Sequence, residues 1–146
     1  MTARPRIEVN ATNPALEDHD RILALLNEDN RRRAEMVDRS DIAVLLRDPE
    51  TGEVVGGLWA EDDFAWVFVK YLVVPEQLRG QGLGAQLMQR AEEEARERGR
   101  IGIWLNTFDF QSRGFYEKLG YEPFGRLDGT NAADGQTFLR KHLHPL

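Results

Sequence analysis

A glycine-rich turn with an arginine at its start is the stretch of this sequence best suited to chemistry. It reads Arg79-Gly80-Gln81-Gly82-Leu83-Gly84. Because glycine has no Cβ, the backbone N–H groups of such a turn can approach a ligand closely, and a helix that starts there adds positive potential. Arg79 brings a cation to the same anion. The turn therefore predicts a binding site for a diphosphate.

Two elements must hold this turn in place. The β-branched and aromatic run from Phe64 to Val74 predicts a buried strand, and Pro75 ends it because proline cannot donate to a sheet. After the turn, an apolar stripe predicts an amphipathic helix that stops at Gly99. The stripe consists of Leu83, Leu87, Met88, Ala91 and Ala95. We expect Glu92, Glu93 and Glu94 on the solvent side of that helix.

The strand before the turn is predicted to alternate between two faces. One face would carry Phe64, Trp66, Phe68, Lys70, Leu72 and Val74. The other would carry Val67, Val69, Tyr71 and Val73.

Three other interpretations of the glycines compete with a diphosphate site. Gly80-x-Gly82-x-x-Ala85 matches a dinucleotide-binding fingerprint, but only about 60 residues follow it, too few for the rest of a doubly wound domain. The next predicted strand also ends in Asn106-Thr107 and not in an acidic residue. A Walker loop is excluded because no Gly-Lys-Ser/Thr follows. An ordinary tight turn stays open on these residues alone.

Two motifs together resemble one known superfamily. Arg79-x-x-Gly82-x-Gly84, after a strand that ends in Val-Val-Pro, resembles the acetyl-CoA signature Q/R-x-x-G-x-G/A of the GNAT N-acetyltransferases. Gly114 to Tyr121 (GFYEKLGY) resembles the second landmark of that superfamily, a short helix carrying a tyrosine. The resemblance is strong from Val54 to Leu127, and the segment Asn106 to Gln111 is similar to a small bacterial branch whose substrates are mostly unassigned.

The resemblance implies a fold of the α/β (α+β) class in one domain, residues 1–146. Its sheet is mixed and mostly antiparallel, with helices on both faces. The strands Phe64–Val74 and Ile101–Thr107 would form a central parallel pair that splays apart into a cleft for CoA. By the same resemblance, the residues that bind the cofactor acetyl-CoA are Leu72, Val73, Val74, Arg79, Gly80, Gln81, Gly82, Leu83, Gly84, Ala85, Ser112 and Phe115.

The implied reaction is acyl transfer from a thioester to an amine, and Tyr116 matches the tyrosine of the superfamily. A phenol with a pKa of about 10 can protonate a leaving thiolate. The competing interpretation is an aromatic side chain that packs on a short helix and bonds its hydroxyl to the backbone. We expect the developing oxyanion to accept a hydrogen bond from a strand N–H near Val73 or Val74.

The general base is not fixed by the sequence. Many relatives place an acidic residue on the central strand, where this chain has Lys70, which serves as a base only if burial depresses its pKa. Lys70 could instead neutralise a substrate acid, pair with a carboxylate, or extend into solvent. The other candidates are Asp62, Asp63, Asp109, a water relay, or direct attack by an amine already neutral in part.

Composition limits the class of protein. The chain has 146 residues, no cysteine and a formal charge of −6, so it argues against a disulfide framework, a thiolate metal site and a nucleic-acid binder. The acidic balance is compatible with a cationic amine as substrate. Its histidines, His19, His142 and His144, are too widely spaced for a metal triad, so no metal is expected. Without an apolar leader or membrane-length run, we expect a cytoplasmic protein, and a homodimer by resemblance.

The remaining elements complete the order β-α-β-β-β-α-β-α-β-β. Before the segments above, we expect a strand at Ile7–Val9, a helix over residues 15–29, and a positive helix end or irregular turn at Arg31–Arg33. Strands at Asp41–Arg47 and Glu53–Ala60 follow, joined by a turn at Asp48–Gly52, and then an acidic loop at Glu61–Asp63. Towards the end of the chain we expect a helix from Gln111 or Ser112 to Leu119 and a hairpin of Tyr121–Leu127 and Gln136–Leu143 around a polar loop at Asp128–Gly135.

Two hypotheses for function follow. The first is an acetyl-CoA-dependent N-acetyltransferase that acts on a primary amine of a small molecule or peptide. The second is a non-catalytic acyl-CoA-binding or interaction domain of the same fold. Lys70 and the polar loop keep the second open, and Tyr116 favours the first.

Overall fold

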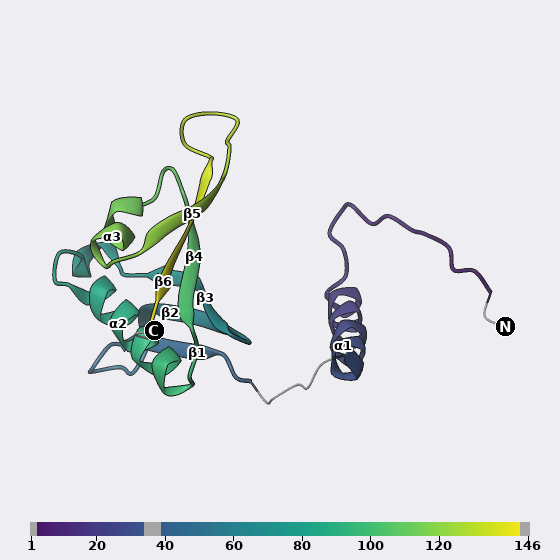
Figure 1. Cartoon of the computed structure of the whole chain (residues 1–146), viewed down its shortest axis with the longest axis horizontal. Coiled ribbons are helices and arrows are strands. Elements are labelled where there is room, and N and C mark those ends of the chain that lie inside the picture. The colour runs from purple at the N-terminus through teal and green to yellow at the C-terminus, as the bar shows by residue number, and fades with distance from the viewer. Residues whose placement is uncertain (1–2, 34–38, 144–146) are drawn as a thin grey trace. The chain divides into compact units, whose positions relative to one another are not determined.

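The computed structural model describes residues 3–33 and 39–143. By its internal contacts the chain divides into two compact units, Met1–Asp38 and Arg39–Leu146, which Figure 1 draws in order from purple to yellow. Each unit is described by itself. His144, one of the three histidines considered above, lies outside the described residues.

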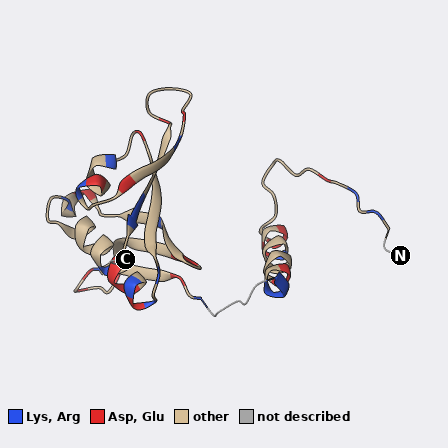
Figure 2. Cartoon of the chain, viewed as in Figure 1, with Lys and Arg blue, Asp and Glu red and all other residues tan. Residues whose placement is uncertain are grey.

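Within residues 3–33, the described part of the first unit, there is one helix, α1, Leu16–Arg33. Acidic residues occupy its first turn and Arg31–Arg33 its last, as the helix dipole favours, and Figure 2 shows the basic end in blue. The predicted helix is therefore confirmed, and it continues through the arginines, which form no irregular turn. The predicted strand at Ile7–Val9 is wrong: these residues belong to no strand, because the described residues give them no hydrogen-bonding partner.

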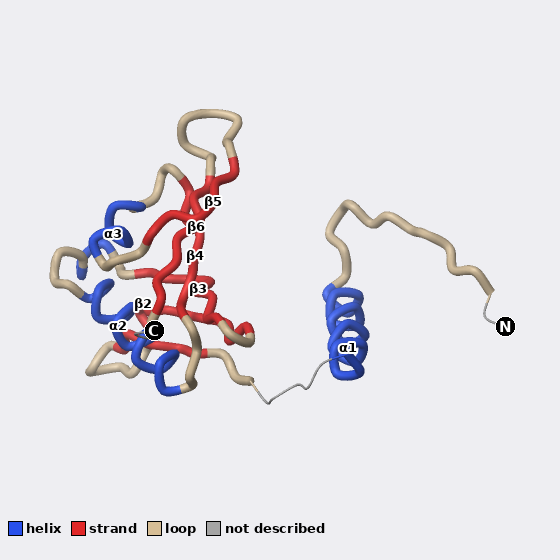
Figure 3. Tube along the Cα trace, in the orientation of Figure 1, coloured by secondary structure: helices blue, strands red, loops and turns tan. Residues whose placement is uncertain are grey.

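The second unit is built on one mixed sheet of six strands, in the order β1-β2-β3-β4-β6-β5 (Figure 3). The strands are β1 Ile42–Arg47, β2 Val54–Asp63, β3 Trp66–Val73, β4 Gly102–Phe108, β5 Glu122–Leu127 and β6 Gln136–His142. All pairings are antiparallel except that of β3 with β4, which is parallel. This confirms the predicted mixed, mostly antiparallel sheet with a central parallel pair.

Helix α2, Leu83–Glu97, packs on one face of this sheet. The stripe predicted for it is the buried one: Leu87, Met88, Ala91 and Ala95 are each at most 3% exposed. Gly99 ends the helix in the left-handed conformation, with φ +73. The short helix α3, Arg113–Lys118, follows β4 and packs against the same core through Phe115, Tyr116 and Leu119.

Two local predictions near the start of β3 are wrong. The acidic stretch Glu61–Asp63 is no loop but the end of β2, and the chain reverses at Phe64 and Ala65. Phe64 has a left-handed φ of +63 and belongs to this turn, so β3 begins only at Trp66. An apolar residue in a left-handed turn is uncommon, which is why composition placed it in the strand.

Candidate functional site

The site predicted from the sequence lies where β3 and β4 end. Parallel strands finish at the same edge of a sheet, so the turn after β3 and helix α3 after β4 gather at one edge. Only three register pairs join the two strands in the described residues, from Trp66↔Gly102 to Phe68↔Trp104. Beyond them the facing edges no longer pair, as expected of strands that part to admit a ligand.

An extra residue in β3 accompanies this separation. Trp59 of β2 faces Tyr71 and Ala60 faces Val69, so Lys70 is left over as a bulge. The bulge reverses the alternation, and Leu72 and Val74 pack toward the core while Tyr71 and Val73 are exposed. The predicted faces are therefore correct from Trp66 to Val69 and wrong after Lys70.

The glycines of the turn adopt the backbone that the prediction required. Gly80 and Gly82 have φ of +81 and +77, and a Cβ built on either one meets no atom within 4 Å. Gly82 is the N-cap of α2 and offers no side-chain hydrogen bond, so the first N–H groups of the helix have no side-chain cap. The open space above both glycines and the uncapped donors together favour an anion.

Arg79 and Gly84 connect the turn to its neighbours. The Arg79 Nε donates to the carbonyl oxygen of Val74 at 3.1 Å, which fixes the guanidinium over the end of β3. A Cβ on Gly84 would lie 3.1 Å from the ring of Phe115, so glycine is needed there for α3 to pack on the start of α2. Phe115 therefore lies against the turn, as its predicted role requires.

Of the other predicted cofactor residues, three belong to the turn and the start of α2, and Ser112 belongs to α3. Gln81 is exposed, and Leu83 and Ala85 are half-buried in the first turn of α2. Ser112 is the exposed N-cap of α3, without a side-chain capping bond.

Tyr116 is half-buried on α3, with its ring edge-on to two other aromatic rings. The centroid of Phe115 is 5.0 Å away and that of Tyr121 6.1 Å away. Burial raises the pKa of the Tyr116 phenol above its ordinary value, so it is protonated at neutral pH. In the part of the chain that the structure describes, its hydroxyl has no hydrogen-bond partner and keeps contact with solvent. Of the competing interpretation, the packing of the ring against the core is found, but no backbone group among the described residues bonds to the hydroxyl.

Two candidate bases, Asp62 and Asp63, are in unsuitable places. Asp62 and Asp63 end β2 and lie beside the start of β3, at the opposite edge of the sheet from the turn. Asp62 is also buried between Arg100 at 2.7 Å and Arg98 at 3.1 Å, and its hydrogen bond from Arg100 lowers its pKa.

Asp109 lies at the correct edge, after β4, but both its oxygens accept hydrogen bonds from Arg126 at 2.9 and 2.8 Å. The Arg126 guanidinium lowers the pKa of Asp109, which makes this carboxylate a weak base. Lys70 is an exposed cation with its Nζ 3.7 Å from Glu61, so it has paired with a carboxylate as one of its predicted roles allowed.

The sequence interpretation missed one buried acid. Glu92 was expected on the solvent side of α2, yet it is 5% exposed and accepts a hydrogen bond from the hydroxyl of Tyr121 at 3.0 Å. The signal was in the spacing, because Glu92 lies four residues after Met88 and three before Ala95, on the apolar stripe itself.

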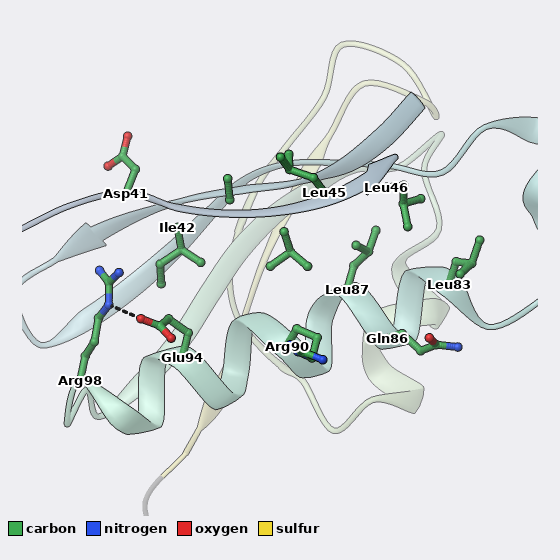
Figure 4. A pocket seen from close by; sticks show the side chains of 12 residues that line it. Asp41, Ile42, Leu45, Leu46, Leu83, Gln86, Leu87, Arg90, Glu94 and Arg98 are labelled. Carbon is green, nitrogen blue, oxygen red and sulfur yellow. Dashed lines mark hydrogen bonds and ion pairs between the residues drawn. The ribbon is translucent and has the colours of Figure 1, made fainter. Parts of the chain in front are cut away.

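Helix α2 also borders a hollow on its β1 side. A cavity of about 650 Å³ runs between β1 and α2, lined by Ile42 and Leu46 on the strand and Leu87 and Arg90 on the helix (Figure 4). Leu83 is the one predicted site residue that lines it. Its apolar floor and charged rim do not include Tyr116.

Within residues 3–33 and 39–143, no helix is both long and apolar enough to cross a membrane. The same described residues contain no cluster of three or more side chains suited to a metal ion.

Comparisons with known proteins agree with this geometry. The blasticidin-S acetyltransferase of Streptomyces morookaense is 47% identical over 73 residues, which cover 49% of this chain and 54% of that protein. A crystal structure from Agrobacterium tumefaciens, described as an acetyltransferase, is 31% identical and has a TM-score of 0.85 over 94% of this chain and 99% of its own. An aminoglycoside 6′-N-acetyltransferase solved with coenzyme A is 25% identical, with a TM-score of 0.65 over 96% of this chain and 97% of its own.

The match to a family model decides the classification. The model of the acetyltransferase (GNAT) family matches residues 10–121, more than half of the sequence. The chain therefore belongs to the GNAT family of acetyltransferases.

Proposed function

We propose that this protein transfers the acetyl group of acetyl-CoA to a primary amine of a small molecule. One observation carries the proposal: at the edge where β3 and β4 stop pairing, the uncapped start of α2 contacts the helix that carries Tyr116. A diphosphate site and a proton donor thus lie on touching elements. A peptide amine is the second acceptor class to test.

Acetyl-CoA would be held mainly by backbone groups. The N–H groups from Arg79 to Ala85 would bind the pyrophosphate, with the Arg79 guanidinium beside it. The exposed edge at Leu72, Val73 and Val74 would pair with the amide groups of the pantetheine arm, as a strand pairs with a neighbour. Ser112 and Phe115 would line the same channel from α3. The coenzyme supplies an activated thioester, and the protein supplies position and protons.

The chemistry then needs two proton transfers. The neutral amine nitrogen forms a bond to the acetyl carbon while the carbon–sulfur bond breaks, and a strand N–H near Val73 or Val74 stabilises the oxyanion. The departing sulfur takes the phenolic proton of Tyr116, which stays protonated at working pH because burial raises its pKa. The amine proton leaves to water, since Asp62, Asp63 and Asp109 are misplaced or ion-paired, and water returns a proton to the Tyr116 phenolate, so that one proton passes in total from nitrogen to sulfur.

The relatives support a small amine as acceptor. Blasticidin-S acetyltransferase and aminoglycoside 6′-N-acetyltransferase are named for small molecules, and the latter was solved with coenzyme A. The formal charge of −6 favours the approach of cationic molecules of this kind.

Three wider expectations accompany the proposal. We expect the chain to work as one domain, which the match of the family model over residues 10–121 supports because it reaches into both units. We also expect a homodimer. The cytoplasm stays the predicted compartment, to be tested by cell fractionation.

An assay of CoA release tests the function. Purified protein is mixed with acetyl-CoA and a panel of small amines and peptide N-termini, and free thiol is measured with and without each acceptor. Acceptor-dependent release, with the acetylated amine found by mass spectrometry, is the expected result. Tight binding of acetyl-CoA without release for any amine would identify the non-catalytic binding domain instead.

A further inference from the structure

A buried carboxylate on α2 has no part in the mechanism above. Glu92 is 5% exposed, and its two oxygens are shared between different partners. Oε2 accepts a hydrogen bond from the Tyr121 hydroxyl at 3.0 Å, and Oε1 accepts one from Lys141 Nζ at 2.7 Å. Arg96 lies 3.9 Å from Oε1 on the same helix. A charge buried in this way is costly unless it is paired, so the partners are required for its burial.

The two hydrogen-bond donors belong to elements other than α2. Tyr121 directly precedes β5, three residues after the end of α3, and Lys141 is in β6. Glu92 therefore joins the helix of the predicted phosphate site to the segment that follows α3. Since α3 has only six residues, its position depends on such contacts more than on its own hydrogen bonds.

Tyr121 in turn contacts Tyr116 directly. The backbone N–H of Tyr121 donates to the carbonyl oxygen of Tyr116 at 3.1 Å, and the two rings meet edge-on at 6.1 Å between centroids. Tyr121 is 3% exposed, and burial together with the charge of Glu92 raises the pKa of its phenol, so its hydroxyl remains a donor.

Tyr116 is thus held between two anchors on one helix. On one side Phe115 packs on Gly84 in the first turn of α2. On the other side, the Tyr121 hydroxyl donates a hydrogen bond to Glu92. Glu92 lies eight residues after Gly84 on α2, which is about 12 Å at the rise of an α-helix. Both anchors fix α3 relative to the start of α2.

We propose that Glu92, acting through the hydroxyl of Tyr121, is a positioning residue that holds the phenol of Tyr116 at its working distance from the start of α2. This inference rests on the proposed function, because it assigns the geometry of the same reaction. Glu92 itself touches neither coenzyme nor acceptor.

A double-mutant cycle tests the inference by activity. Tyr121→Phe removes the hydroxyl and keeps the ring, and Glu93→Gln, on the exposed neighbour, is the matched control. We expect Tyr121→Phe to lower kcat about tenfold with unchanged acetyl-CoA affinity, and to have no further effect in a Tyr116→Phe background. An equal loss in both backgrounds would mean that the bond only stabilises the fold, and would overturn the inference.

A second measurement needs no turnover. The chain has three tyrosines, so uniform labelling with 3-fluorotyrosine gives three fluorine signals, and Tyr116→Phe identifies that of Tyr116. In Tyr121→Phe and Glu92→Gln we expect the Tyr116 signal to shift or broaden, while Glu93→Gln leaves it unchanged. A Tyr116 signal unchanged in all three variants overturns the inference. A perturbed signal in a protein that acetylates no amine would instead leave the positioning role intact and remove the proposed function.

Discussion

At the scale of single residues, the hydroxyl of Tyr116 is distinguished by what it lacks. It is half-buried between two rings and has no hydrogen-bond partner among the described residues, whereas the neighbouring Tyr121 hydroxyl is fully engaged by Glu92. A phenol that reaches solvent and bonds to no described protein group can donate to a ligand, whereas one held by a buried carboxylate cannot. The contrast between two tyrosines five residues apart therefore supports a chemical role for one and a structural role for the other.

Removal of the Tyr116 hydroxyl should affect chemistry and not binding. We expect Tyr116→Phe to lower kcat for amine acetylation by about 100-fold, the lower end of what a general acid contributes, with the Kd for acetyl-CoA unchanged. Steady-state kinetics and calorimetric titration measure the two quantities. Equal kcat values for the variant and the parent protein would exclude Tyr116 as the proton donor.

Asp62 is expected to matter for stability alone. Asp62→Asn leaves Arg98 and Arg100 without their buried counter-charge, and we expect the free energy of unfolding to fall by about 2–4 kcal/mol at pH 7. The neighbouring Asp63→Asn is the control, because the Asp63 residue is exposed whereas Asp62 is buried. It should change stability by less than about 0.5 kcal/mol.

The effect of Asp62 has a defined dependence on pH. Its pKa is lower in the folded protein than the ordinary value of 3.8, so the ionised form stabilises the fold above that value. This stabilisation is lost as the pH falls through the folded pKa. Urea unfolding should therefore show the full difference between parent and Asp62→Asn at pH 7 and a shrinking one below about pH 3.8. A constant difference down to pH 2.5 would contradict the ion-pair explanation.

At the scale of elements, two glycine turns allow backbone strain to be separated from ligand contact. Gly82 before α2 and Gly52 in the β1–β2 turn have φ of +77 and +75, and neither has an atom within 4 Å of a built Cβ. Valine at either position should cost about 1–2 kcal/mol of stability, because both backbones are left-handed. Only Gly82→Val should also weaken the binding of acetyl-CoA, raising its Kd about tenfold or more, because the valine side chain would enter the space for the phosphates.

Isothermal titration of both variants measures the Kd for acetyl-CoA, and urea unfolding measures their stability. If Gly82→Val bound acetyl-CoA as tightly as Gly52→Val, the phosphate site would have to lie elsewhere.

Local patterns predicted these elements well where the cause is local. Left-handed glycines, an apolar stripe and a terminating Gly99 define α2 within its own sequence, and the Gly114–Tyr121 motif did the same for α3. The bulge at Lys70 arises from pairing with β2, which is distant in sequence. The sequence contains no sign of it, because apolar residues occupy both faces of Trp66–Val74 apart from Lys70.

At the scale of the whole molecule, the sequence predicted the order of the elements along the chain from Asp41 onward, but not every strand and not the place of β6 beside β4. The run at Ile7–Val9 has the apolar alternation of a strand, yet a strand exists only when another supplies its hydrogen bonds. The burial of Glu92 was missed for a related reason: the partners that allow it come from residues 121 and 141, far along the chain. Contacts between distant residues are what a local pattern cannot contain.

The expected homodimer belongs to this scale. A cavity of about 580 Å³ in the second unit is lined by exposed Phe124 and by half-buried Trp66, Trp104 and Phe138. Exposed apolar surface of this kind favours association. Light scattering after size exclusion should give about twice the chain mass of 16.7 kDa. A mass of one chain at every concentration up to about 100 μM would contradict the dimer.

The early end of the β3–β4 pairing also affects how the protein behaves when it is purified. No pair of these strands follows Phe68↔Trp104 in the described part of the chain, so the facing amides beyond it depend on water. In the proposed function, the amide groups of the pantetheine arm of acetyl-CoA would replace that water and bridge the two strands. At a hundredfold excess over Kd, acetyl-CoA adds about 2.7 kcal/mol to the free energy of unfolding. We therefore expect the protein without acetyl-CoA to unfold at a lower temperature, beginning where β3 and β4 no longer pair. The rise in unfolding temperature on adding acetyl-CoA would then measure the fraction of protein that has bound it.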